Sequence, residues 1–259
     1  MKNLKFVQSL LVDSRNRRTG NPLNNFHIDT QINVSNVDCF AIDRVFMTNN
    51  IYPVNQYTHS LQTVYDNSGV VETLNITLAH GSYTITALCS AVQTALNFAS
   101  NALGYTTTYT CSFSNTTQKV TITGTSTPAG TLETVTGTLA PLLGFNNTTI
   151  GISNSLVGSD PVNIVYTRYL NICSQFLSKY NKPNVKTDAQ TPGIIYTLNN
   201  NYYAFGSSIK ENVRNLRHTQ WSGDETINNF DIQVYDDSNR LADMNNSEFQ
   251  FVINFYKYE

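Results

Sequence analysis

The side chains that could bind a metal ion or transfer protons are few, and they lie far apart in the sequence. The histidines show neither H-x-H nor H-E-x-x-H spacing, and they are His27, His59, His80 and His218. Zinc sites are usually built from such closely spaced ligands. We therefore expect isolated histidines on strands or at the surface, and no metal site.

The acidic segment at residues 236–243 offers oxygen atoms that could hold a calcium ion. Its candidate ligands are Asp236, Asp237, Asn239 and Asp243. They do not follow the spacing of a calcium-binding loop, and Asp and Asn side chains commonly hydrogen-bond their own backbone in turns. The favoured interpretation is a solvated turn between two strands, with a calcium site as the alternative.

Nucleophilic catalysis and nucleotide binding find no support in the sequence. Ser90 and Ser207 do not lie in a G-x-S-x-G motif, and neither G-x-G-x-x-G nor G-x-x-x-x-G-K-[ST] occurs. We therefore predict that the protein is not an enzyme and that it has no catalytic residues, no cofactor and no small-molecule substrate.

The four cysteines are scattered and form no C-x-x-C pair: they are Cys39, Cys89, Cys111 and Cys173. We expect them to be small buried hydrophobic residues in a reducing compartment, with disulfides as the less favoured alternative. An apolar run near the start is interrupted by Asp13 and Arg15, so it is too short for a signal peptide. This pattern predicts synthesis in the cytoplasm.

The composition favours a protein that packs against other proteins. Charged residues make up 13% of the chain, which is about half of the ~25% usual for soluble domains. Uncharged polar side chains must therefore cover much of the surface, and they form hydrogen bonds without long-range repulsion. The formal net charge of -2 argues against a protein that coats nucleic acid. No apolar run reaches the roughly 18 residues of a membrane-spanning helix.

Two segments in which apolar and polar residues alternate strictly are predicted to be strands. Phe230, Ile232 and Val234 alternate with polar residues, and residues 249–255 alternate again after a turn at 236–239. Period-two alternation places one set of side chains against a core. Such a closing pair is typical of a β-sandwich.

The middle of the chain changes from strand periodicity to helix periodicity. Apolar residues recur at helical spacing and would form one stripe, at Ile85, Leu88, Val92, Leu96 and Ala99. Thr84 is suited to cap this helix. A hairpin at 105–122 and a compact apolar segment at 139–145 are expected to follow, and the Gly/Thr-rich stretch at 124–138 is expected to be cut first by proteases.

This change in periodicity predicts a mainly β protein with a discontinuous domain. Residues 1-72 and 160-259 carry short strand candidates, and we expect them to form one jelly-roll β-sandwich. Residues 73-159 are expected to form a small inserted α+β domain.

Basic residues concentrate at the start of the chain. Five of its sixteen Lys and Arg are Lys2, Lys5, Arg15, Arg17 and Arg18. They form either a solvated, partly disordered terminus or an arm that contacts acidic surfaces of a partner. Further along, Trp221 is expected to anchor the core, with a contact between subunits as the alternative.

Short motifs follow one another along most of the chain. At the start these are Asp13-Ser14-Arg15-Asn16-Arg17, Phe26-x-Ile28 and Asn50-x-Tyr52. In the middle they are Gly81-x-Tyr83, the helix with Leu88, Val92 and Leu96, and Leu142-Leu143-Gly144-Phe145. At the end they are Phe230-x-Ile232-x-Val234-x-Asp236 and residues 249–258. In this order they resemble the penton and minor capsid proteins of large icosahedral double-stranded DNA viruses and their virophages.

The resemblance implies a single jelly roll with an insertion, five copies of which form a homopentamer at the fivefold vertices of a capsid. The implied partners are further copies of this chain, the major capsid protein and other minor capsid proteins, and the implied location is the virion. The family has no catalytic residues to carry over.

Within this resemblance, the basic residues at the start would form a capsid-contact arm that reaches a neighbouring capsid protein, an inner membrane or the genome. Two alternatives keep the same fold: another minor capsid or spike-base protein, and a carbohydrate-binding jelly-roll attachment protein. A hydrolase that uses the insertion as a lid lacks the residues for its chemistry.

Overall fold

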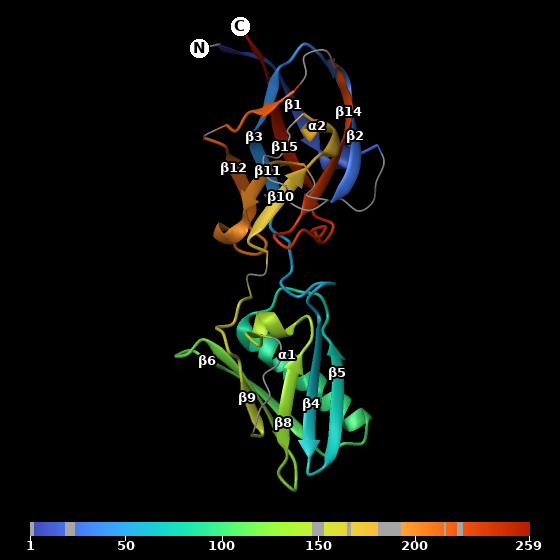
Figure 1. Cartoon of the computed structure of the whole chain (residues 1–259), viewed down its shortest axis with the longest axis vertical. Coiled ribbons are helices and arrows are strands. Elements are labelled where there is room, and N and C mark those ends of the chain that lie inside the picture. Colours follow the sequence, from blue (N-terminus) through green and yellow to red (C-terminus); the bar gives the residue numbers. More distant parts are fainter. Residues whose placement is uncertain are drawn as a thin grey trace. The chain divides into compact units, whose positions relative to one another are not determined.

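The protein is mainly β and forms two compact units (Figure 1). The computed structural model describes residues 3–18, 24–146, 153–164, 167–180, 193–214, 216–221 and 225–259. The first unit comprises Met1–Ile51 and Thr167–Glu259, and the second comprises Tyr52–Tyr166. In the described part of the chain, no helix has both the length and the apolar character needed to cross a membrane.

The first unit contains two antiparallel sheets. The strands of the first sheet, in spatial order, are β1 (Leu4–Asp13), β15 (Phe249–Tyr258), β3 (Cys39–Thr48) and β12 (Ser208–Asn212), and β13 (Thr219–Gln220) also pairs with β3. The strands of the second sheet are β11 (Ile194–Asn199), β10 (Tyr169–Cys173), β14 (Ile227–Tyr235) and β2 (Asn25–Val34). Three short helices complete the unit: η1 (Ser14–Asn16), α2 (Gln175–Ser178) and η3 (Asn200–Tyr202).

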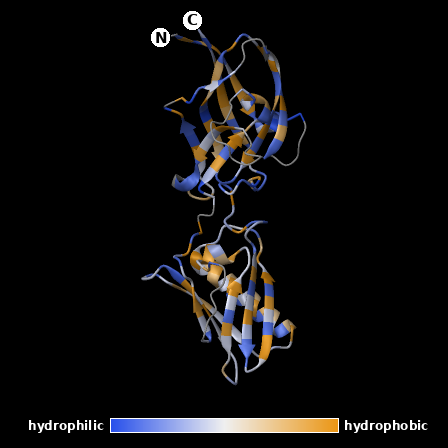
Figure 2. Ribbon diagram, viewed as in Figure 1, coloured by the Kyte–Doolittle hydropathy of each residue, from blue (hydrophilic) through white to orange (hydrophobic). Residues whose placement is uncertain are grey.

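One hydrophobic core joins these two sheets. The predicted alternation of β15 is confirmed, because Phe251, Ile253 and Phe255 are fully buried while their neighbours along the strand are not. The rings of Phe26 on β2 and Phe249 on β15 lie 5.6 Å apart and connect one sheet to the other. Figure 2 shows hydrophobic and hydrophilic residues alternating along the strands. The sheets thus enclose a shared core, as the sheets of a β-sandwich do.

The second unit combines two three-stranded sheets with one long helix. The first of these sheets contains, in spatial order, β5 (Val70–Thr77), β4 (Ser60–Asn67) and β8 (Thr131–Thr136). The second contains β6 (Thr108–Ser114), β7 (Lys119–Thr125) and β9 (Ser155–Val157). The helix is α1 (Ile85–Ala102), and a short helical turn, η2 (Ala140–Leu143), follows β8. These elements share a separate hydrophobic core.

The sequence predictions for the helix and the hairpin are confirmed. The Thr84 hydroxyl accepts a hydrogen bond from the backbone N–H of Ala87 and caps α1. The predicted apolar stripe faces the core through Leu88, Val92 and Leu96. β6 and β7 pair as an antiparallel hairpin, and the expected apolar segment buries Leu143 and Phe145.

The boundary between the two units differs from the predicted one. The sequence predicts an insertion at 73-159, whereas the second unit extends from Tyr52 to Tyr166. The reason is β4, which pairs with β5 on one side and with β8 on the other and therefore belongs to the second unit. Alternation identifies a strand and its buried face, but it does not reveal which sheet the strand joins.

Three local expectations can be compared with the structure. The stretch at 124–138 contains a mostly exposed loop at 126–130 and then strand β8, whose Leu132 and Val135 are buried, and its early cleavage stays a prediction. Within the strand candidates predicted at 160–259, Val162 and Ile164 lie outside the strands and pack against the second core. Residues 4–13, treated above as part of a basic terminus, form strand β1.

Candidate functional site

The histidines do not converge on a metal site in the described part of the chain. The rings of His59 and His80 pack edge to face with their centroids 5.3 Å apart, and His218 packs against Tyr256 at 5.1 Å. Among the described residues, no group of three or more His, Cys, Asp or Glu side chains could hold a metal ion. The contact between His59 and His80 depends on the fold, and their sequence spacing gives no sign of it.

The acidic segment at 236–243 forms a turn held together by an ion pair. One oxygen of Asp236 accepts hydrogen bonds from the backbone N–H groups of Ser238 and Arg240, each at 2.9 Å. The other oxygen accepts from the Arg240 guanidinium at 2.9 and 3.0 Å. Asp237 and Asp243 accept backbone N–H groups as well. The carboxylates therefore have partners from the protein itself, which supports the interpretation of this segment as a turn.

The four cysteines are buried and form no disulfide. The Cys89 and Cys111 side chains hydrogen-bond each other, and this bond together with burial raises the pKa of Cys111. Burial also raises the pKa of Cys173 to about 12. Protonated, buried thiols are poor nucleophiles. The prediction of small buried hydrophobic residues is confirmed.

The predicted core role of Trp221 is also confirmed. The side chain is 5% exposed and belongs to the core of the first unit. Its Nε1 donates a hydrogen bond to the backbone carbonyl of Glu225 at 3.2 Å, and its ring packs 5.3 Å from that of Phe176. Ser90, by contrast, is exposed on α1, and the Ser207 hydroxyl donates to the backbone carbonyl of Ala204.

The basic residues at the start lie on a strand and on the turn that follows it. Lys5 is part of β1 and forms an ion pair with Glu259 at 2.7 Å. Arg18 forms one with Asp29 at 3.0 Å, and Arg17 donates a hydrogen bond to the Ser14 carbonyl. Lys2 lies outside the described residues. These side chains belong to the sheet and its corner, and their contact with a neighbouring capsid protein stays a prediction.

Arg15 has a structural role where β1 meets β15. Its guanidinium donates to both oxygens of Asp13, at 2.5 to 3.0 Å, and Gln250 donates to the same carboxylate at 2.7 Å. The hydrogen bonds from Arg15 hold the pKa of Asp13 below its ordinary value. This network ties the end of β1 to the beginning of β15.

The outward side of β1 carries an unusual number of exposed apolar side chains, which we call the β1 surface. Its members are Leu4, Phe6, Val7 and Leu11, which are 42%, 53%, 42% and 57% exposed. Leu11 lies opposite Val252 of β15, and Phe6 packs edge to face on Tyr256 at 6.1 Å. Val7 sits at an irregularity in the β1–β15 register, between Phe6 and Gln8.

β1 is also an edge strand in the described structure. It pairs with β15 on one side, and no described strand pairs with its other side. Edge strands present unpaired backbone groups, and contiguous exposed apolar side chains mark interaction surfaces. The β1 surface is therefore suited to contact another protein through apolar side chains and edge hydrogen bonds together.

Comparison with known proteins does not assign the chain to a family. The chain matches no protein-family model and no curated protein.

Proposed function

We propose that the protein is a penton, a structural protein at the fivefold vertices of an icosahedral viral capsid, and that its first unit is a jelly roll. Eight strands of this unit, counted along the chain, are β1, β2, β3, β10, β11, β12, β14 and β15. If these eight strands are numbered 1 to 8 along the chain, the spatial order is 1-8-3-6 in the first sheet and 5-4-7-2 in the second. The count omits β13, which has two residues.

The strand order is the observation that carries the proposal. Two four-stranded sheets of this order arise when a long hairpin folds over into two Greek keys, which is the jelly roll found in viral capsid proteins and lectins. The second unit enters between the third and fourth of the eight strands, after β3 and before β10. We propose that it is an insertion domain of this jelly roll.

The β1 surface supplies a contact for assembly. In a closed ring, each subunit uses one patch to contact a different patch on its neighbour. An edge strand with exposed Leu4, Phe6 and Leu11 suits the apolar centre of such a contact. The low content of charged residues, 13%, reduces repulsion between identical chains. The partners are then further copies of the chain, the major capsid protein and other minor capsid proteins.

The deciding experiment is localisation of the chain in purified virions. We expect its density at the fivefold vertices in a reconstruction of the particle, with five copies at each vertex and contacts to the major capsid protein. Density at threefold sites or along facet edges would favour another minor capsid role. Absence of the chain from particles would contradict a structural role in the virion.

A further inference from the structure

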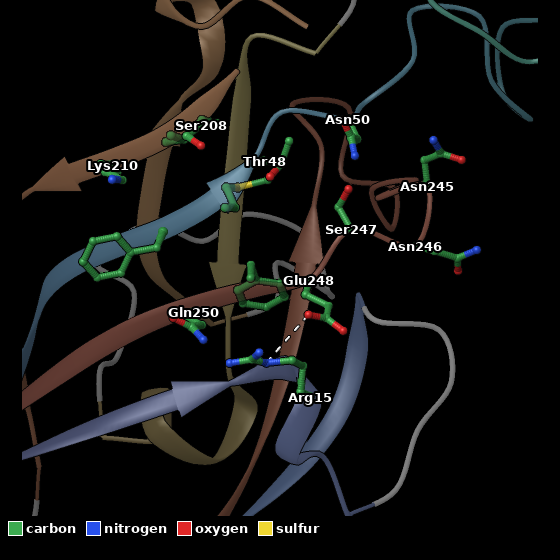
Figure 3. A pocket seen from close by; sticks show the side chains of 14 residues that line it. Arg15, Thr48, Asn50, Ser208, Lys210, Asn245, Asn246, Ser247, Glu248 and Gln250 are labelled. Atoms are coloured by element: carbon green, nitrogen blue, oxygen red, sulfur yellow. Dashed lines mark ion pairs between the residues drawn. The ribbon is translucent and has the colours of Figure 1, made fainter. Parts of the chain in front are cut away.

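A pocket of about 500 Å³ opens at one end of the first sheet of the first unit (Figure 3). It is formed where β3 ends, β12 begins and β15 begins, together with the turn at 244–247 and Arg15. Pockets of roughly 300–1,000 Å³ are typical of small-ligand sites. None of the catalytic or metal motifs considered above falls in this pocket.

The pocket is lined mainly by neutral groups that form hydrogen bonds. Figure 3 shows amides and hydroxyls around it, from Thr48, Asn50, Ser208, Asn245, Asn246, Ser247 and Gln250. Apolar residues also belong to the lining: the half-buried Phe46, and Met47, Ile209 and Phe249, whose side chains are buried in the core. A ligand for this pocket needs many hydroxyl or amide groups and also a less polar face.

The amides of Asn245 and Asn246 are held by a tight turn. Both residues have left-handed backbone angles, with φ of 45° and 57°. The N–H of Ser247 donates to the carbonyl of Met244 at 2.8 Å and closes the turn. Asn tolerates this conformation better than most residues. The turn therefore fixes the backbone from which the two exposed amides project.

Ser247 provides the sharpest sign of a missing ligand. Its side chain lines the pocket although the residue is only 8% exposed, and its hydroxyl has no hydrogen-bond partner in the described structure. A buried polar group without a partner is unfavourable, and native proteins rarely leave one. The oxygen itself is covered in this structure, so a ligand hydroxyl would reach it only after a local shift of the turn.

Charge in the pocket is nearly balanced. Arg15 is neutralised by Asp13 at 2.5 Å and lies 3.7 Å from Glu248. Lys210 forms no ion pair with the described carboxylates, and it is exposed on β12. A strongly charged ligand would find one cation at the rim and a carboxylate nearby. The lining favours an uncharged ligand.

We propose that this pocket binds a neutral carbohydrate. Sugar hydroxyls both donate and accept hydrogen bonds, which matches the amides and hydroxyls of the lining. The C–H face of a sugar ring would lie against the half-buried Phe46. This activity goes beyond assembly and would allow the chain to bind a glycosylated surface.

The test is a titration of the full chain with free oligosaccharides. The neutral probes end in galactose, N-acetylglucosamine or mannose, and a sialylated form of the galactose probe serves as the acidic counterpart. Saturation-transfer NMR identifies binding, and calorimetry gives the dissociation constant. We expect saturable binding of at least one neutral probe, with the sialylated form binding no more tightly.

Three variants place the binding in the pocket. Asn246→Gly removes an amide while keeping the left-handed turn, and Ser247→Ala removes the unpartnered hydroxyl. Each should weaken binding about three- to tenfold, the effect of one lost hydrogen bond. Lys210→Ala should change the affinity less than about twofold for an uncharged ligand. The matched control is Asn212→Ala, an exposed position on β12 outside the pocket lining.

Several results would overturn the proposal. The first is that no neutral probe shows saturable binding. The second is that neither Asn246→Gly nor Ser247→Ala weakens the binding. The third is that the sialylated probe binds more tightly than the neutral one and that Lys210→Ala abolishes this preference. Each leaves the penton proposal standing, because virion localisation is measured independently.

Discussion

The hydroxyl of Ser14 accepts a hydrogen bond from the backbone N–H of Phe249 at 3.0 Å, although the two residues are 235 positions apart. Ser14 is fully buried and follows β1 directly, and Phe249 opens β15. The neighbouring contact from Gln250 to Asp13 spans 237 positions. The corner between the two strands is therefore held by side-chain hydrogen bonds as well as by the backbone pairing of β1 with β15.

We expect Asp13→Asn to destabilise the first unit by about 1–3 kcal/mol, because the change weakens charge-assisted hydrogen bonds at a buried carboxylate. Denaturant unfolding followed by the fluorescence of Trp221, the only tryptophan, measures this effect. The matched control is Asp29→Asn, because Asp29 pairs with Arg18 at an exposed site. It should shift stability by at most about 0.5 kcal/mol. Equal effects of both changes would contradict the role of Asp13.

The same carboxylate predicts a pH dependence. Its folded-state pKa is lowered below the ordinary value of 3.8, so the stabilisation is fully present above that value and is lost as the pH falls through the folded-state pKa. The stability difference between the wild type and Asp13→Asn should therefore shrink as the pH falls below about 4. Unfolding curves from pH 7 to pH 3 test this. A difference that stays constant throughout would argue against a titrating Asp13.

Replacing Phe251 or Ile253 with Asp should prevent the first unit from folding. Both side chains are fully buried, and an unpaired buried charge costs far more than the ~1 kcal/mol of a typical point mutation. Val252→Asp is the matched control, because Val252 lies between them on the opposite face of β15. Solubility and circular dichroism report the outcome. A soluble, native-like Phe251→Asp variant would show that this position is not in the core.

Leu11→Lys should weaken self-association and leave folding intact. Leu11 is 57% exposed on the β1 surface, so the charge is tolerated in the monomer but repels a second apolar surface. Sedimentation at increasing protein concentration measures association, and incorporation into virions measures assembly. Val157→Lys is the control, at a 50% exposed position in the second unit. Unchanged assembly of Leu11→Lys would exclude the β1 surface as a subunit contact.

Glu72→Gln should stabilise the second unit, by about 1 kcal/mol or more. Glu72 is 2% exposed, and its carboxylate accepts a hydrogen bond from Asn67 at 3.1 Å while one oxygen has no partner. Burial, and then the Glu72 charge, raise the pKa of the nearby Tyr109 hydroxyl. Hydrogen exchange of α1 in the full chain reports the stability of the unit. The control is Glu133→Gln, at a partly exposed position of β8. Slower hydrogen exchange of α1 in this control variant but not in Glu72→Gln would contradict the prediction.

Elements with a strong local period could be predicted from the sequence. The stripe from Leu88 to Leu96 fixes a helix, and the alternation from Phe249 to Phe255 fixes a strand with one buried face. The assignment of β4 to the second unit could not be predicted, because strand pairing depends on residues distant in the sequence. β1 could not be recognised by alternation, because Leu10, Leu11 and Val12 are consecutive apolar residues, and basic neighbours made the segment resemble a terminus.

The residues of the pocket could not be predicted from the sequence either, because the fold brings them together. Asn50, Ser208 and Ser247 belong to three distant segments, and each is an ordinary polar residue of a loop or strand end. The burial of the Ser247 hydroxyl without a partner, which it shares with other buried polar atoms of the described residues, arises only in the folded chain.

The place of β15 between β1 and β3 also sets an order of events during synthesis (Figure 1). Ser9 and Asn254, which hydrogen-bond across β1 and β15, are 245 positions apart, whereas the second unit is one continuous segment. The second unit can therefore fold while the later strands of the first are still being translated. Until β15 arrives, β1 and β3 lack the strand that joins them, and such non-local closure is slow and prone to aggregation.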